Sequence, residues 1–156
     1  MTMSTARSLA CSLALLGVLG PVRTLHAQLG IGTWVREVTP TTTAMTMKVE
    51  PCCGEGHRLT YHFDINGTEM ILALSSRFDG SEADVLMNGK PSGETMAITQ
   101  VDDRHFETIV KLNGQPFGTS KATLSADGKV LTVVNDFSSS VGGNPAGKST
   151  ETWVRQ

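Results

Sequence analysis

The chain has 156 residues, 13 basic and 15 acidic side chains, and a formal net charge of −2. The basic residues form no cluster, so we expect no nucleic-acid partner. No apolar run after the N-terminal region is long enough for a membrane-spanning helix, and we expect no stable membrane insertion.

The first 27 residues are predicted to be a secretory signal peptide. A short basic region ends at Arg7, an apolar run extends from Leu9 to Leu19, and Pro21 ends that run. The run is too short to span a bilayer, but it is typical of a signal-peptide core. We therefore expect cleavage after Ala27, rather than an uncleaved anchor, and export to the periplasm or the extracellular space.

Residues 28–156 are long enough for a single domain with its own core. From residue 32 onward, the chain is predicted to form strands joined by tight turns. Asn-Gly and Asp-Gly pairs favour hairpin turns because both residues tolerate positive φ. The expected turns are Asn66-Gly67, Asp79-Gly80, Asn88-Gly89, Asp102-Asp103, Asn113-Gly114 and Asp127-Gly128.

About nine strands are expected between these turns: 33–38, 44–50, 57–65, 69–78, 94–101, 104–112, 116–125, 129–138 and 148–155. The acidic residues Asp79, Glu82 and Asp84 are assigned to turns. Consecutive antiparallel strands with one apolar face each most simply close into a barrel, because closure removes exposed edges. We predict an all-β fold with a single antiparallel up-and-down barrel, and a two-sheet β-sandwich is the alternative.

The turns also predict which residues face each other. A two-residue turn at Asn66-Gly67 places apolar residues on one face of its hairpin: Leu59 with Leu74, Tyr61 with Leu72, and Phe63 with Met70. The same reasoning pairs Val110 with Phe117 and Leu124 with Leu131. Met96 lies opposite Val110 only if the loop after Val101 has three or five residues. Pro116 cannot donate a backbone hydrogen bond, so it should lie at a strand end or a bulge.

The two ends of this region carry a recognisable pattern. The first strand contains Gly32-Thr33-Trp34, and the last contains Trp153 and Arg155. A Gly-x-Trp in the first strand with a late Arg resembles the calycin signature of lipocalins and fatty-acid-binding proteins. "SSRFDG" (75–80) and residues 101–134 are similar to small secreted bacterial lipocalin-like proteins. The resemblance implies barrel closure by Gly32, Trp34, Trp153 and Arg155, with the Arg packed across the Trp.

Few residues suggest reactive chemistry. Cys52, Cys53 and His57 could bind a soft metal, but adjacent cysteines point apart in an extended chain and zinc sites usually space them by two to four residues. Pro51, Gly54 and Gly56 indicate a turn instead. Met45 and Met47 are predicted to be core residues, and His62 and His105 to face solvent. We therefore expect no metal, no cofactor and no catalytic residue.

The leading interpretation is a protein that binds a small apolar molecule inside the barrel. The expected lining residues are Leu59, Tyr61, Phe63, Met70, Leu72 and Phe106. Two alternatives remain: a barrel enzyme, such as an isomerase or hydrolase for an apolar substrate, and a ligand-free structural or envelope-stress protein. An inward polar cluster would favour the enzyme, an apolar cavity the binding protein, and a packed interior the third class.

Overall fold

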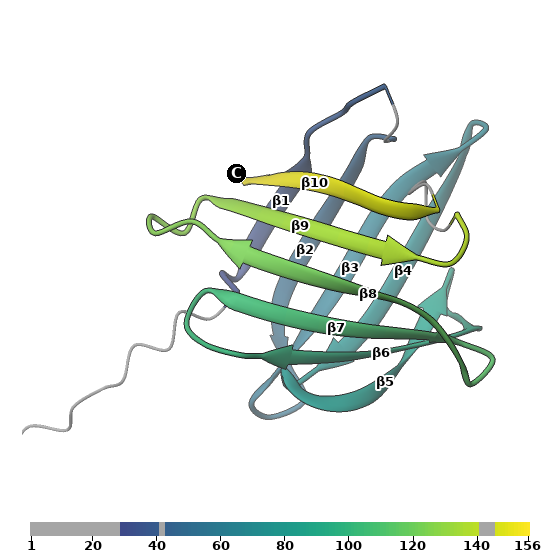
Figure 1. The fold of residues 1–156 in the computed structure, drawn as a ribbon, viewed down its shortest axis with the longest axis horizontal. Helices are drawn as coiled ribbons and strands as arrows, with labels where there is room; N and C mark the ends of the chain where they lie inside the picture. Colours follow the sequence, from purple (N-terminus) through teal and green to yellow (C-terminus); the bar gives the residue numbers. More distant parts are fainter. Residues whose placement is uncertain (1–28, 41–42, 141–145) are drawn as a thin grey trace, which may run out of the picture.

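The computed structural model describes residues 29–40, 43–140 and 146–156, so the segment predicted to be a signal peptide lies outside the described residues. The described chain forms ten strands (Figure 1). They are β1 (Gly32–Arg36), β2 (Met45–Cys52), β3 (Gly56–Ile65), β4 (Thr68–Ser76), β5 (Asp79–Met87), β6 (Lys90–Gln100), β7 (His105–Leu112), β8 (Gln115–Leu124), β9 (Val130–Phe137) and β10 (Gly147–Arg155).

Each strand pairs with its neighbours in sequence, and β1 pairs with β10 to close the barrel. The closing register places Trp34 opposite Arg155 and Arg36 opposite Trp153. All pairings are antiparallel, so the prediction of a single up-and-down barrel is confirmed and the sandwich alternative is excluded. The described residues contain no helix long and apolar enough to cross a membrane.

Most of the predicted turns and registers are confirmed. Asn66 and Gly67 have φ angles of 53° and 80°, and the hairpin places Leu59, Tyr61 and Phe63 opposite their predicted partners. Leu124 faces Leu131 across the β8–β9 hairpin. Met96 faces Val110 as predicted, and the last facing pair, Gln100 with Phe106, encloses the five residues 101–105.

The expected turn at Asp79-Gly80 was wrong, and the strand count was therefore one too low. The chain reverses at Arg77 and Phe78, where Phe78 has a φ of 59°, and Asp79 begins β5. Asp79, Glu82 and Asp84 thus lie on a strand rather than in turns. Two register shifts interrupt the pairing of β5 with β6, so the side chains do not alternate regularly and the strand has no clear apolar period.

The predicted pairing of Val110 with Phe117 was also wrong. Val110 lies opposite Gly118, because a bulge between Val110 and Lys111 shifts the register by one residue. Pro116 lies beside this bulge, as expected. A Cβ atom at Gly118 would come within 2.6 Å of the Asp136 carbonyl oxygen and would also meet the Phe137 ring, so this position requires glycine.

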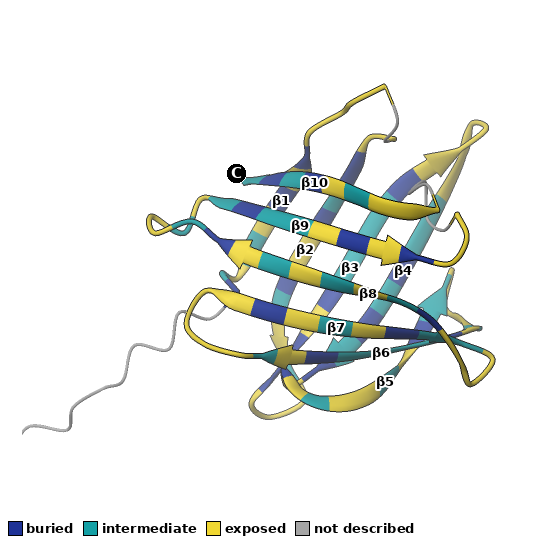
Figure 2. Ribbon diagram, viewed as in Figure 1, coloured by how far each residue is buried: buried dark blue, intermediate teal, exposed yellow. Residues whose placement is uncertain are grey.

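The hydrophobic core fills the inside of the barrel. Buried and exposed residues alternate along most strands, which gives them one inner and one outer face (Figure 2). Met45 and Met47 are buried, as predicted, and Trp34, Val49 and Val85 are fully enclosed. A smaller cluster of Val110, Phe117 and Phe137 packs beside the bulge.

Candidate ligand-binding site

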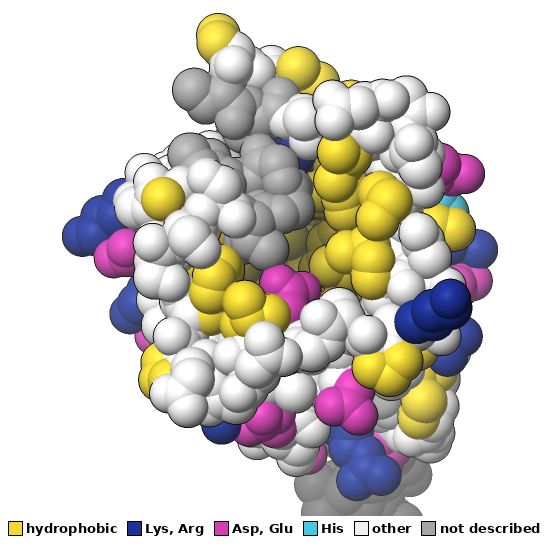
Figure 3. Space-filling view, turned by 90° about the vertical axis from the view of Figure 1, so that its right-hand side faces the viewer, with side chains coloured by type: hydrophobic (Ala, Val, Ile, Leu, Met, Phe, Trp, Pro, Cys, Tyr) yellow, Lys and Arg dark blue, Asp and Glu magenta, His cyan; other side chains and the backbone are white. Residues whose placement is uncertain are grey.

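A cavity of about 170 Å³ lies inside the barrel. Figure 3 shows a hollow whose walls are mostly hydrophobic, with an acidic side chain among them. Apolar side chains from β2, β3, β6, β7 and β9 make up most of the lining, and Leu29 contributes from the segment before β1. The polar lining residues are Tyr61, Glu94, Thr108, Ser120, Asn135 and Glu151.

Most of the residues predicted to line a ligand site do line this cavity. They are Leu59, Tyr61, Phe63, Leu72 and Phe106. Met70, the sixth, is half-buried and packs against the core, and its sulfur accepts a hydrogen bond from Asn88 Nδ2 at 3.6 Å. The structure therefore places Met70 beside the β5–β6 turn rather than in the cavity wall.

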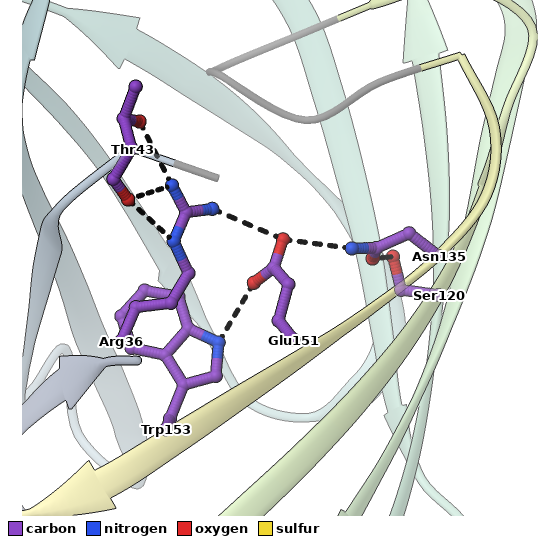
Figure 4. Close-up of polar contacts among 6 residues, drawn as sticks. All are labelled: Arg36, Thr43, Ser120, Asn135, Glu151 and Trp153. Carbon is purple, nitrogen blue, oxygen red and sulfur yellow. Dashed lines mark hydrogen bonds and ion pairs between the residues drawn. The ribbon is translucent and has the colours of Figure 1, made fainter. Parts of the chain in front are cut away.

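A buried polar network forms one side of the cavity (Figure 4). Glu151 Oε1 accepts hydrogen bonds from Arg36 Nη1 at 3.3 Å and Asn135 Nδ2 at 2.9 Å. Glu151 Oε2 accepts another from Trp153 Nε1 at 2.9 Å. The hydroxyl of Ser120 donates to Asn135 Oδ1 at 2.7 Å, so the network joins β1, β8, β9 and β10.

Hydrogen bonds to Thr43 and contact with the Trp153 ring hold the Arg36 side chain in this position. Its side chain is fully buried, and its Nε and Nη2 donate to the Thr43 carbonyl oxygen at 3.1 and 2.6 Å. The guanidinium carbon lies 5.8 Å from the centre of the Trp153 ring, which is a cation–π geometry. Arg36 thus compensates the charge of Glu151 and fixes the orientation of that carboxylate.

The carboxylate of Glu94 differs from that of Glu151 in its surroundings. It lies on the inner face of β6, is only 9% exposed and lines the same cavity. No described residue forms a hydrogen bond or ion pair with its carboxylate; Ser92 contacts only its backbone NH group. Burial raises the pKa of Glu94 above its ordinary value.

Tyr61 lies near both the network and the cavity. Its ring packs edge-on against Trp153, with 6.0 Å between ring centres. Burial, followed by the nearby negative charge of Glu151, raises the pKa of the Tyr61 phenol. The phenol therefore stays protonated and can donate a hydrogen bond to a molecule in the cavity.

Apart from Tyr61, the polar lining residues were missed by the sequence interpretation, although the alternation of side chains could have located them. Glu94 shares the inner face of its strand with Met96 and Ile98. Glu151 shares a face with Trp153. Following the inward positions of each strand, instead of the apolar residues alone, would have placed these carboxylates inside the barrel.

Three of the residues expected to close the barrel, Gly32, Trp34 and Arg155, lie together, whereas Trp153 pairs with Arg36, whose guanidinium lies over the Trp153 ring. Trp34 Nε1 donates to the Gly30 carbonyl oxygen at 3.1 Å, and Arg155 Nη2 donates to the Ile31 carbonyl oxygen at 2.6 Å. The Arg155 guanidinium lies so close to Gly30 that a Cβ there would be 2.7 Å from Nη1. Gly32, with a φ of 145°, lies beside the same side chain.

The two cysteines lie in and beside the turn between β2 and β3. Cys52 is the last residue of β2, while Cys53 is exposed with a φ of 56°, and both are free thiols. His57 is buried instead, and its ring stacks on Phe78 at 5.0 Å between ring centres. Among the described residues, no three His, Cys, Asp or Glu side chains form a group that could hold a metal ion.

One stretch, "GGNPAGKS" (142–149), has the residue spacing of a phosphate-binding P-loop. That motif binds phosphate where a strand is followed by the loop and then by a helix. Here Gly147, Lys148 and Ser149 begin strand β10, which pairs with β9. The spacing alone therefore gives no support for a nucleotide site.

The geometry of the site is thus a small apolar cavity with one compensated and one uncompensated carboxylate. Comparison with known proteins finds no family model that matches the chain and no matching curated protein.

Proposed function

We propose that this protein binds a small, mostly apolar molecule inside the barrel after export to the periplasm or the extracellular space. The observation that carries the proposal is the cavity of about 170 Å³, which is lined mainly by apolar side chains. Its volume is similar to that of an apolar protein cavity of roughly 150 Å³ that takes up benzene. The ligand should therefore be about the size of one substituted ring.

The proposal draws on the resemblance to lipocalins and fatty-acid-binding proteins as well as on the cavity. The barrel is closed, and Gly32, Trp34 and Arg155 lie together at one end. In a calycin-like protein, the ligand would lie in the interior above this closed end. The cavity also weighs against a ligand-free structural protein, whose interior would be packed.

The test uses toluene as a ring-sized probe, followed by ligand-detected NMR. Ala122 lines the cavity, whereas the adjacent Thr123 is exposed on the outer face of β8. Ala122→Phe should fill the cavity and abolish binding, while the matched control Thr123→Phe should bind toluene like the wild-type protein. Equal binding by both variants would place the site elsewhere, and absence of binding by wild-type protein would refute the proposal.

The endogenous ligand can be sought in parallel. Native mass spectrometry of the protein purified from its own host should show a retained small molecule, which would be lost from Ala122→Phe.

Intact-mass measurement of the exported protein should give Gln28 as the first residue. A retained Met1 would contradict the proposed signal cleavage.

An isomerase acting by proton transfer is the second candidate function, and Glu94 is the observation that favours it. A buried carboxyl group whose pKa is raised above its ordinary value can act as a general base or acid. The test is conversion of 3-cyclohexenone to its conjugated isomer, in which a proton is removed beside the carbonyl and returned at the far alkene carbon. Turnover that persists in Glu94→Gln would exclude this role for Glu94.

A further inference from the structure

The carboxylates of the cavity differ in whether a positive charge accompanies them. Glu151 has Arg36 at 3.3 Å and two further hydrogen-bond donors, so its charge is balanced. Glu94 has no cation and no hydrogen-bond donor on its carboxylate from any described residue. When Glu94 is ionised, the cavity therefore carries one uncompensated negative charge.

A buried charge without a partner is unfavourable, and a positively charged group that enters the cavity removes that penalty. A ligand carboxylate would instead meet two negative groups. A neutral hydroxyl could donate one hydrogen bond but would leave the charge uncompensated. An ammonium ion supplies both the charge and several donors, so it fits the Glu94 carboxylate best.

We propose, on the basis of the proposed ligand-binding function, that the ligand is a small hydrophobic amine whose ammonium group pairs with Glu94. The apolar body would lie among Leu59, Phe63 and Leu72, which line the same cavity. The volume of about 170 Å³ limits this body to about one ring. The Arg36–Glu151 pair is already satisfied and supplies a fixed polar wall.

The test compares four ligands of the same shape in isothermal titration calorimetry: 2-phenylethylamine, 2-phenylethanol, ethylbenzene and phenylacetate. Wild-type protein should bind the amine about 10- to 100-fold more tightly than the alcohol, because hydrogen bonds to charged groups are the strong ones. Phenylacetate should bind most weakly. Glu94→Gln should lose the preference for the amine while still binding the alcohol and ethylbenzene, which shows that its cavity is intact.

Glu107→Gln is the matched control. Glu107 is an exposed residue on β7 that pairs with Lys121 at 2.9 Å, and the preference for the amine should persist in this variant. If the alcohol binds wild-type protein as tightly as the amine, or if Glu94→Gln keeps the preference, the amine inference is wrong while the ligand-binding function stands. If none of the four ligands binds, both fail.

Discussion

Two glutamates on inner strand faces show how neighbouring groups decide the role of a side chain. Glu151 is surrounded by donors from Arg36, Asn135 and Trp153, and it serves to hold β10 to its neighbours. Glu94 is also buried, but it faces the cavity without a donor on its carboxylate among the described residues. The first is therefore a structural group, and the second is available to a ligand.

The raised pKa of Glu94 makes its effect on stability depend on pH. Because burial raises this pKa above the unfolded value, the favourable contribution of the protonated carboxyl is complete at low pH and is lost as pH rises through the folded pKa. Glu94→Gln resembles the protonated form at every pH. We expect it to match wild-type stability near pH 4 and to exceed it increasingly toward about pH 8.

Urea unfolding across this pH range measures the difference. The exposed Glu107→Gln variant should show no such growing gain over wild-type protein. A stability difference for Glu94→Gln that stays constant with pH would contradict this prediction. It would mean that another group in the folded protein stabilises the ionised Glu94 carboxylate.

Arg155 is predicted to stabilise the closed end of the barrel. Its guanidinium donates to the Ile31 carbonyl oxygen and lies over Gly30 and Gly32, so it fastens the segment before β1. Arg155→Ala should lower the free energy of unfolding by roughly 1–3 kcal/mol, since a hydrogen bond to a charged group is lost. Arg104→Ala, in the exposed β6–β7 loop, is the control, and an equal effect of both would show that Arg155 does not close the end.

Among the elements, β1 is short and depends on the polar network for its position. It pairs with β10 through only three residues, but Arg36 also links it to Glu151 and Thr43. Through Asn135 and Ser120, the same network extends across β9 to β8. The polar network on one side of the cavity therefore also links four strands near the point where the barrel closes.

A double-mutant cycle can measure the coupling energy between Arg36 and Glu151. Arg36→Met removes the cation that pairs with Glu151, and Glu151→Gln removes the carboxylate that pairs with Arg36, so each variant alone should lower the free energy of unfolding by about 3–5 kcal/mol. The double variant should be destabilised by clearly less than the sum of the two single effects, because both members of the pair are then neutral. If the effects in urea unfolding add within about 0.5 kcal/mol, the two charges do not act as a pair.

Strands with regular alternation could be predicted from the sequence, whereas irregular strands could not. The β3–β4 hairpin has a two-residue turn and three facing apolar pairs, and both its turn and its register were correct. β5 is interrupted by two register shifts and has a single fully enclosed residue, Val85, so its acidic residues suggested a turn. The bulge at Val110 likewise depends on the close contact of Gly118 with β9, which local sequence does not encode.

The candidate site was predictable in its apolar part for the same reason. Leu59, Tyr61 and Phe63 follow the period-two pattern of a regular strand, and all of them reach the cavity. The polar part depends on which inward positions meet across the barrel. Glu151 and Arg36 are far apart in sequence, and only closure through β1 and β10 brings them to 3.3 Å.

The strands of the barrel wall are unevenly paired. β3 and β4 are joined through nine facing residue pairs, whereas β4 and β5 share only two, Leu72 with Met87 and Ala73 with Leu86. Asn88 extends this junction through hydrogen bonds with the backbone of Ile71. Farther along, a surface cleft of about 250 Å³ lies between the end of β4 and the start of β5, and its lining includes Ser75 and Glu82.

This uneven pairing predicts where the barrel opens first. Backbone NH groups in the first half of β5 that face β4 have no strand partner there, so they should exchange with solvent through small local openings. In hydrogen exchange followed by NMR, we expect alternate amides in residues 80–84 to exchange early. The amides of residues 58–64 on β3, which are paired with β2 and β4, should exchange late.

The comparison distinguishes a local opening from unfolding of the whole barrel. If the barrel opened only as a unit, the amides of β5 and β3 would exchange with the same free energy of opening. Equal protection of the two segments would therefore contradict a weak β4–β5 junction. Early exchange confined to β5 would instead show that the wall loosens beside the cleft while the hairpin that lines the cavity, β3–β4, stays formed.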